Sequence, residues 1–319
     1  MKYRRLGKTG LMVSVVGLGT WQFGGEWGKE FEQSEVDAMF DRARDLGMNL
    51  IDTAECYGDH TSERLIGSAI NRDRSKWIVA TKFGHKFHSY MNRTDTRTVE
   101  TVRQELEESL RALRTDYIDL YQYHSWGDDT FFKEDVQAEL EKQLAAGKIR
   151  HLGNSVAKND NVKQISASEA KQVEFIQIIY NRLDRTPENT TFPMCIEQDL
   201  GVLARVPLAS GFLSGKYRPG HRFTEGDVRS GRDQKIVDEK LKEVEQIARE
   251  EVPQGTDMAT WALAWCLQHA AVTSVIPGVK SVEQVESNAR AAELEIVKQD
   301  HPQAWKEQRA TSGTHPEAP

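Results

Sequence analysis

Two hydrophobic patterns alternate along the chain. Apolar runs of about five to eight residues are separated by longer stretches in which apolar residues recur every three or four positions. The short runs are typical of buried parallel strands, and the longer stretches of amphipathic helices. Strands are predicted at residues 15–19, 48–52, 77–82, 117–124, 149–155, 175–180, 202–207 and 273–277. Eight such repeats close a barrel, so the pattern predicts an α/β fold of the (β/α)8 TIM barrel type.

The segment before the first of these strands has a different pattern. Residues 3–6 and 11–14 alternate in polarity around a turn bounded by Gly7 and Gly10. Two short alternating segments around such a turn predict a β-hairpin. We expect this N-terminal hairpin to plug the floor of the barrel.

Two connections are too long for ordinary loops. They cover residues 83–96 and 208–232, and in a barrel both emerge at the C-terminal face of the strands, where active sites are built. We expect one (β/α)8 barrel domain over residues 1–300. The polar segment 301–319 is predicted to be a disordered tail.

The charge balance argues against two classes of partner. The 319 residues include 42 Lys and Arg against 49 Asp and Glu, a formal net charge of −7. An acidic chain has no electrostatic reason to bind nucleic acid or an anionic membrane, and we expect neither. We also expect no signal segment and no membrane span, because no apolar stretch is long enough. Three widely separated cysteines indicate no disulfide framework, so a cytoplasmic location is expected. The protein is expected to be a monomer or a homo-oligomer.

Four side chains near the ends of predicted strands suggest catalysis. Asp52 ends the second strand and Tyr57 follows it in the run Asp-Thr-Ala-Glu-Cys-Tyr-Gly, while Lys82 ends the third strand. His124 ends the fourth strand. Singly, they are explained as a helix N-cap, a half-buried aromatic residue, a surface cation and a core histidine. Jointly, they fall at the C-terminal ends of adjacent strands, where side chains converge on one pocket.

This set of groups is suited to giving a proton to a carbonyl oxygen. A free phenol has a pKa of about 10 and is a poor acid at neutral pH unless a neighbouring cation stabilises its phenolate. Lys82 is the candidate cation, and Asp52 is the counter-charge that keeps a buried ammonium protonated. His124 can orient the carbonyl through a hydrogen bond. The residues predict a carbonyl reductase with Tyr57 as its general acid.

Longer motifs surround these residues. They are Asp-x4-Tyr-Gly at 52–58, Thr-Lys at 81–82, Tyr-Ile-Asp-Leu-Tyr-x2-His at 117–124, Arg-Arg-Leu-Gly-Lys-Thr-Gly-Leu at 4–11, Gly-Leu-Gly-Thr-Trp at 17–21, Gly-Lys-Ile-Arg-His-Leu-Gly at 147–153 and Pro-Leu-Ala-Ser-Gly-Phe-Leu-Ser-Gly-Lys at 207–216. These motifs resemble the aldo-keto reductase superfamily, in particular its bacterial general-stress and inositol-cluster branch and the related potassium-channel β subunits. The resemblance implies reduction by NADPH, which becomes NADP⁺, without metal or flavin. It also implies that Tyr57 is the acid, that Lys82 and Asp52 tune it and that His124 orients the substrate.

The same resemblance implies a set of cofactor-binding residues. They are Gly19, Thr20, Trp21, Asp52, Ser155, Gln177, Arg205, Pro207, Leu208, Ser210, Gly211, Leu213, Lys216, Gly278, Lys280, Gln284 and Asn288. Ser155 and Gln177 would hold the nicotinamide carboxamide, and the loop 210–216 would cross the pyrophosphate. Lys280 would pair with the 2′-phosphate. A surface lysine at a helix start is the alternative interpretation of Lys280.

Two positions depart from the family pattern. The family has Gly-Val-Ser-Asn after the fifth strand, whereas this chain has Gly-Asn-Ser-Val at 153–156, which keeps the Ser but not the Asn in its usual place. Arg205 stands where most members have an aromatic ring against the nicotinamide, and a guanidinium plane can also stack there. The alternative for Arg205 is an ion pair with a loop carboxylate.

Aromatic residues in the loops of the C-terminal face are candidates for substrate binding. They are Trp21, Trp27, Phe83, Tyr90 and Trp126. Such a rim would suit an aldehyde, a ketone or the edge of a sugar ring, although anchoring of the loops against helix ends explains each residue equally well.

Other motifs fail on their spacing. The pair Gly17 and Gly19 lacks the third glycine of a dinucleotide fingerprint, so a Rossmann fold is not supported. His85 and His88 lack a third ligand at a suggestive spacing, and no metal site is predicted.

Two other functions stay open at this point. Channel β subunits share the barrel, the four residues and a bound NADPH, which allows a redox-sensing regulatory subunit. A sugar-modifying enzyme that recycles its bound nicotinamide within one turnover would use the same residues in other roles. Net consumption of NADPH with an aldehyde would favour the reductase.

Overall fold

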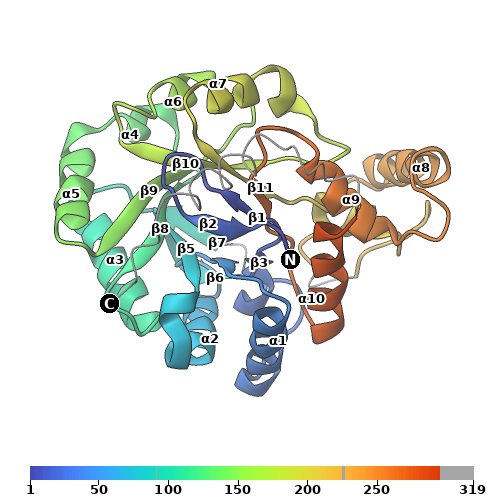
Figure 1. The fold of residues 1–319 in the computed structure, drawn as a ribbon, viewed down its shortest axis with the longest axis horizontal. Helices are drawn as coiled ribbons and strands as arrows, with labels where there is room; N and C mark the ends of the chain where they lie inside the picture. The colour runs from blue at the N-terminus through green and yellow to red at the C-terminus, as the bar shows by residue number, and fades with distance from the viewer. Residues whose placement is uncertain (91, 225–226, 295–319) are drawn as a thin grey trace, which may run out of the picture.

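Eight parallel strands form a barrel at the centre of the molecule (Figure 1). The computed structural model describes residues 1–90, 92–224 and 227–294. The strands pair in the order β3-β4-β5-β8-β9-β10-β11-β12, and parallel bridges from Val16 to Val275 and from Gly19 to Gly278 join the two edges. Their bounds are β3 (Leu18–Gly19), β4 (Leu50–Asp52), β5 (Ile78–Phe83), β8 (Ile118–His124), β9 (Ile149–Ser155), β10 (Val173–Ile179), β11 (Gly201–Arg205) and β12 (Ser274–Val275). The eight predicted strands and the (β/α)8 barrel are confirmed.

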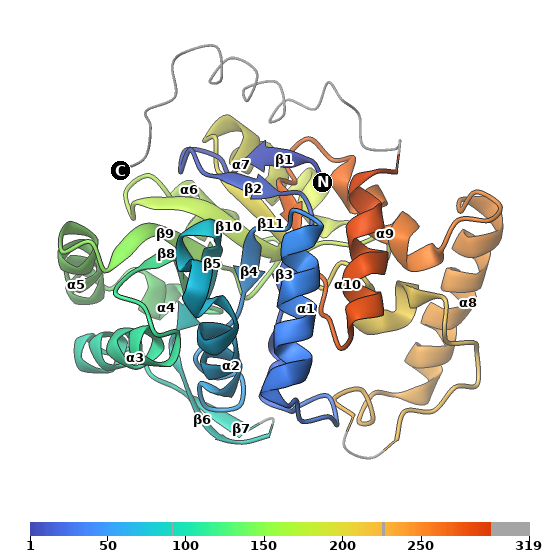
Figure 2. The same ribbon diagram turned by 60° about the horizontal axis from the view of Figure 1, so that its bottom comes forward.

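Helices surround this sheet (Figure 2). Their apolar stripes match the sequence pattern, since Val102, Leu106 and Leu110 are the buried apolar residues of one such helix. The helices are α1 (Gln33–Asp45), α2 (Thr61–Ile70), α3 (Val99–Ala112), α4 (Asp128–Phe131), α5 (Glu134–Ala145), α6 (Val162–Ser166), α7 (Thr191–Glu197), α8 (Gln234–Glu250), α9 (Met258–Leu267) and α10 (Val282–Ala289). Short 3-10 turns are η1 (Trp21–Gly24), η2 (Asn71–Lys76), η3 (Thr186–Asn189), η4 (Ala209–Ser214) and η5 (Arg290–Ala292).

The predicted N-terminal hairpin closes one end of the barrel. Its strands β1 (Tyr3–Arg5) and β2 (Met12–Ser14) pair antiparallel. Leu6 and Val13 are fully buried and belong to the same cluster as the inward-facing strand residues Leu50, Ala80, Leu120, Phe175, Leu203 and Ile276. The hairpin therefore supplies apolar side chains to the barrel interior and acts as its floor.

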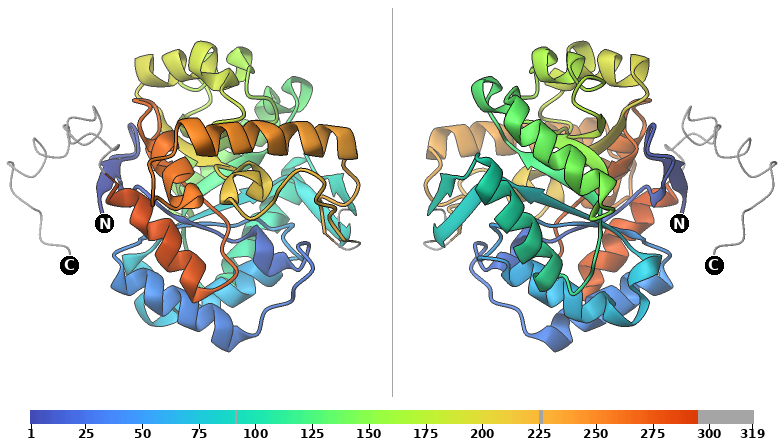
Figure 3. Two further views of the ribbon diagram at one scale, coloured as in Figure 1. Left: turned by 90° about the vertical axis from the view of Figure 1, so that its right-hand side faces the viewer. Right: turned by 90° about the vertical axis from the view of Figure 1, so that its left-hand side faces the viewer.

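The two long connections lie at the other end of the barrel. Figure 3 shows β6 (His85–Ser89) and β7 (Asn92–Asp95), an antiparallel hairpin, opposite the N-terminal hairpin. The second connection contains η4 and leads to α8, where Phe212 and Leu213 form a separate apolar cluster with residues of α8 and α9. Both connections thus reach the C-terminal ends of the strands.

Two expectations concern the end of the chain and the membrane. The predicted tail 301–319, together with the boundary at residue 300, lies outside the described residues. Among the described residues, no helix is both long enough and apolar enough to cross a membrane.

Candidate active site

A buried ammonium lies at the C-terminal ends of β4 and β5. Lys82 is 1% exposed, and its Nζ donates to Asp52 Oδ1 at 3.0 Å and Oδ2 at 2.9 Å. The same Nζ donates to the carbonyl oxygen of Thr53 at 2.7 Å and to Tyr57 Oη at 3.3 Å. Because β4 and β5 are adjacent in the sheet, the ends of the two strands bring these groups together. The predicted approach of Asp52, Tyr57 and Lys82 is present in the structure.

Burial and charge act against each other on these groups. Burial acts to lower the pKa of Lys82, but Asp52 and Tyr57 together outweigh it and the pKa is raised. Burial raises the pKa of Tyr57 to about 12, although the Lys82 ammonium pulls it down. At neutral pH the site holds an ammonium beside a protonated phenol. The expected influence of Lys82 on Tyr57 is therefore present, but burial is the larger effect.

Glutamine side chains orient the Asp52 carboxylate. Gln177 Nε2 donates to Asp52 Oδ1 at 2.6 Å, and Gln122 Nε2 reaches the same oxygen at 3.4 Å. Ser155 Oγ donates in turn to Gln177 Oε1 at 3.4 Å. Gln122 was not predicted from the sequence. Its signal was its position two residues before His124, which places a polar side chain on the same inward face of β8.

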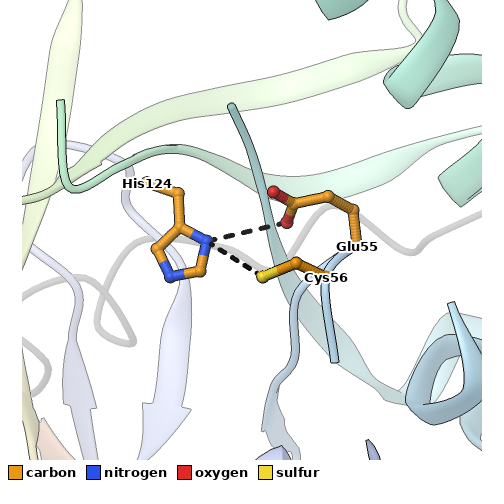
Figure 4. Close-up of side chains that lie close together, drawn as sticks. All are labelled: Glu55, Cys56 and His124. Carbon is orange, nitrogen blue, oxygen red and sulfur yellow. Dashed lines mark hydrogen bonds and ion pairs between the residues drawn. The ribbon is translucent and has the colours of Figure 1, made fainter. Parts of the chain in front are cut away.

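His124 lies beside this cluster and is neutral at neutral pH. Burial lowers its pKa well below the usual range, and nearby His85, Lys82 and Arg93 lower it further. Its ring meets the ring of Tyr57 edge to face, with centroids 6.2 Å apart. Its Nδ1 faces Glu55 and Cys56, and its other ring nitrogen points away from both (Figure 4).

A cavity of about 830 Å³ opens above these residues. Many of the predicted site residues line it, and so do several that the sequence did not indicate. The predicted ones are Gly19, Thr20, Trp21, Trp27, Asp52, Tyr57, His124, Ser155, Gln177, Arg205, Pro207, Leu208, Ser210, Gly211, Lys216, Gly278, Lys280, Gln284 and Asn288. Lys82 lies beneath Tyr57 and does not line it.

The structure contradicts two predicted substrate residues, Phe83 and Trp126. Both side chains are fully buried and neither lines the cavity. Their rings pack edge to face 5.5 Å apart, and Phe83 also stacks on Tyr121. Successive side chains of a strand alternate between faces, so Phe83 points away from the interior into which Lys82 points.

Two further predicted residues lie outside the cavity lining. Tyr90 is 55% exposed, and its Oη donates to Glu30 at 3.4 Å near the tip of the β6–β7 hairpin. Leu213 is fully buried, and its side chain belongs to the cluster around α8 and α9. The substrate prediction for Tyr90 and the cofactor prediction for the Leu213 side chain are therefore not supported by their positions.

Arg205 ends β11 and reaches the cavity without a carboxylate partner among the described residues. Its Nη2 donates to the carbonyl oxygen of Val156 at 3.1 Å, and its buried Nε has no hydrogen-bond partner. Burial lowers its pKa. The alternative of an ion pair with a loop carboxylate is thus not what the structure has. Asn154 does not face the cavity, because its Nδ2 donates to Gln164 Oε1 at 3.0 Å.

Charged and polar residues missed by the sequence analysis line the rest of the cavity. Arg93, from β7, pairs with the buried Glu26, which also accepts a hydrogen bond from Trp21 Nε1. Arg229 donates from Nη1 to the carbonyl oxygen of Ser210 at 3.0 Å. These residues belong to long connections whose path the hydrophobic pattern does not determine.

The region around Lys280 combines cations with unpartnered polar atoms. Lys280 Nζ donates to the carbonyl oxygen of Trp27 at 3.2 Å. Burial lowers the pKa of Lys280, Asp227 opposes this, and Arg229 and other nearby cations lower it further. Asn288 Nδ2 is buried in the same cavity without a hydrogen-bond partner. An anionic, hydrogen-bonding ligand such as a nicotinamide nucleotide fits these groups.

Comparisons with known proteins show to which family the chain belongs. A model of the aldo/keto reductase family matches residues 15–306. An NADH-specific methylglyoxal reductase of Escherichia coli is 29% identical over 314 residues, which cover 93% of this chain and 95% of that protein. A probable voltage-gated potassium channel subunit beta of Oryza sativa is also 29% identical, over 92% of each chain.

Solved structures of similar proteins share the fold of this chain. The holo form of an aldo-keto reductase from Bacillus halodurans superposes with a TM-score of 0.79 at 28% identity and covers 96% of both chains. A glycerol dehydrogenase from Gluconobacter oxydans has the same TM-score and identity, and covers 100% of this chain and 98% of its own.

Proposed function

The chain belongs to the aldo/keto reductase family, and from this premise we propose that it is an NADPH-dependent oxidoreductase that reduces an aldehyde or ketone to an alcohol. The family uses a nicotinamide cofactor. The observation that carries the proposal is the Lys82 ammonium, which contacts both Asp52 and Tyr57 Oη at the base of a large cavity. This arrangement supports Tyr57 as the group that protonates the substrate oxygen.

Each residue of the site has its own proposed role in carbonyl reduction. A bound nicotinamide supplies hydride to the carbonyl carbon. Tyr57 gives its proton to the carbonyl oxygen, and Lys82 stabilises the phenolate that remains. Asp52 keeps Lys82 charged, and neutral His124 holds the carbonyl oxygen by donating a hydrogen bond from the ring nitrogen that faces away from Glu55. The alcohol product leaves through the open cavity.

The preference for NADPH rests on the cations of the cavity. Lys280, Lys216 and Arg229 line it; burial lowers the pKa of Lys280, and Arg229 and Lys216 lower it further. Arg229 is paired with Asp227, whereas Lys280 and Lys216 form no ion pair with a carboxylate among the described residues. The 2′-phosphate of NADPH would add negative charge beside these two lysines, and NADH has no such group. The methylglyoxal reductase of E. coli is named as NADH-specific, so coenzyme choice needs its own measurement in this chain.

The substrate class follows from the walls near Tyr57. Trp21 stacks on Tyr57 with centroids 6.1 Å apart, and Trp27 meets Trp21 edge to face at 5.2 Å. The Arg93 and Glu26 pair adds polar groups to the same region. Flat rings beside a polar pair suit a small carbonyl compound or the open-chain form of a sugar.

The test is a substrate panel with purified protein. Methylglyoxal, glyceraldehyde, an aromatic aldehyde and an aldose are each mixed with NADPH or with NADH, and nucleotide absorbance is followed. We expect net oxidation of NADPH with at least one small carbonyl compound. Conversion of a sugar without net nucleotide oxidation would point instead to internal recycling. Nucleotide binding without turnover of any substrate would point to a regulatory subunit.

Location and partners are proposed on separate grounds. Cys56, Cys195 and Cys266 are all free and buried, which fits the reducing cytoplasm. The proposed partner is a small molecule, and the net charge of −7 gives no attraction for nucleic acid.

A further inference from the structure

Three potential metal ligands lie close together on the Nδ1 side of the His124 ring, and His124 is one of them. Glu55 Oε2, Cys56 Sγ and His124 Nδ1 all lie within 4.8 Å of one another (Figure 4). The distance from Nδ1 to Oε2 is 3.7 Å, and that from Nδ1 to Sγ is also 3.7 Å. The Nδ1 to Oε2 separation is too long for a hydrogen bond. Two ligand atoms bound at about 2.0 to 2.3 Å to one tetrahedral ion are separated by roughly 3.3 to 3.7 Å, which matches this spacing.

One oxygen of the Glu55 carboxyl group has no hydrogen-bond partner in the protein. Its side chain is 2% exposed. Oε1 accepts a hydrogen bond from the backbone N–H of His85 at 3.0 Å, but Oε2 is buried and has no hydrogen-bond partner. Burying a polar atom without a hydrogen-bond partner costs free energy. A ligand bound to this oxygen, which faces His124 and Cys56, would remove that cost.

The combination of donors selects the class of ion. One carboxylate oxygen, one thiolate and one imidazole nitrogen suit a borderline cation such as Zn²⁺, whereas Mg²⁺ and Ca²⁺ prefer oxygen ligands alone. We propose that Glu55, Cys56 and His124 form a binding site for one Zn²⁺ ion, with the fourth position taken by water. Nothing in the proposed reduction requires this ion.

The surroundings allow a cation at this place. The nearby cations Lys82 and Arg93 are already paired with Asp52 and Glu26, respectively. The thiolate and the carboxylate together balance the double charge of Zn²⁺. Binding displaces the thiol proton to solvent, as in other cysteine-ligated zinc sites. His124 lines the cavity, so the site borders the cavity on that side.

Occupancy of the site would change the state of His124. Coordination through Nδ1 leaves the ring proton on the other nitrogen and prevents the imidazole from becoming cationic. His124 would then be held as a hydrogen-bond donor toward the cavity. This consequence rests on the proposed function of His124, but the existence of the site does not.

The experiment measures binding without any substrate. Full-length protein is freed of metal with a chelator under reducing conditions and titrated with Co²⁺, whose bond to thiolate gives a charge-transfer absorption band. We expect the band to grow to one Co²⁺ per chain and to disappear when Zn²⁺ is added. The absence of a band, together with no heat of Zn²⁺ binding in calorimetry, would overturn the proposal.

Matched variants locate the ion. Cys56→Ala should abolish the band, and Glu55→Gln should weaken Co²⁺ binding by about tenfold or more, because outer and inner ligands typically change affinity on that scale. Cys195→Ala removes another buried cysteine, whose thiol lies in the core of the fold, and should leave the band unchanged. A band that survives Cys56→Ala would place the ion elsewhere and refute the site. Circular dichroism tests whether each variant is folded. If Cys56→Ala does not fold, weaker Co²⁺ binding by Glu55→Gln tests the site instead.

Discussion

The two ends of the cavity differ in how far their polar groups are satisfied without a ligand. At the Tyr57 end, Lys82 Nζ has four acceptor atoms, and Asp52 Oδ1 accepts from Gln177 as well. At the Lys280 end, several cations lie close together, only Arg229 among the described ones of the cavity is paired with Asp227, and Asn288 Nδ2 has no partner. The first end is built on adjacent strands and is organised in advance. The second is built largely on loops, and we expect an anionic ligand to complete it.

This difference implies different responses to mutation. A change at the Tyr57 end should remove chemistry and leave nucleotide binding intact. A change at the Lys280 end should alter nucleotide affinity and leave the chemical step intact.

Tyr57→Phe should have the largest effect. It removes the proposed proton donor, so turnover of an aldehyde should fall by a factor on the order of 100 or more. The dissociation constant of NADPH, measured by fluorescence, should stay near normal. Tyr117→Phe, on a phenol outside the cavity lining, is the control. Nearly full activity in Tyr57→Phe would show that another group is the acid.

Lys280→Ala should act at the other end. A charge-assisted contact contributes about 1.5 to 3 kcal/mol, so NADPH binding should weaken by roughly tenfold or more while NADH binding changes little. Lys242→Ala, an exposed lysine of α8, controls for net charge. Equal weakening of both nucleotides would indicate a defect in folding, and no weakening would leave Lys280 as a surface lysine.

Arg205→Trp tests the boundary between the two ends. We propose that the guanidinium lies against the nicotinamide ring in place of the usual aromatic side chain, where a cation disfavours the positively charged oxidised ring. The variant should stay active and bind NADP⁺ more tightly relative to NADPH, by about 1 kcal/mol or roughly fivefold. An unchanged ratio of the two dissociation constants would exclude stacking by Arg205.

The smallest expected effect is that of pH on reduction. Burial raises the pKa of Tyr57 to about 12 against the pull of Lys82, so the phenol keeps its proton throughout the neutral range. Reduction needs the protonated phenol, and kcat should therefore change little between about pH 6 and about pH 9. Alcohol oxidation needs the phenolate and should rise with pH. A fall in the rate of reduction centred near neutral pH would contradict this assignment.

The sequence predicted the strand-built end of the site better than the loop-built end. Asp52, Lys82 and His124 could be placed because each lies at the end of a strand or one residue before it, and the order of strands in a barrel is fixed. Strand lengths were less accurate, since β3 and β12 have two residues each at the seam, where single bridges replace a continuous ladder. Side-chain direction was the main error. Phe83 follows inward-pointing Lys82 and so had to point outward.

The loop-built end could not be derived in the same way. Arg93 and Arg229 reach the cavity through connections whose path depends on tertiary contacts, such as the bond from Arg229 to the Ser210 carbonyl. Glu55 lies within the sequence motif around Tyr57. Its approach to His124 depends on how a short turn packs against β8. Such contacts between distant segments leave no periodic trace in a sequence.

The N-terminal hairpin has a consequence for synthesis of the protein. Arg4 Nη1 donates to the carbonyl oxygen of Val272 at 2.8 Å, across 268 positions of the chain. The hairpin therefore acquires this partner only after the intervening strands and helices have been synthesised. Until then Leu6, Val13 and the inner faces of the early strands stay uncovered, and contacts so distant in sequence form slowly. The hairpin is therefore expected to dock onto the barrel late in folding, after β12 has been synthesised.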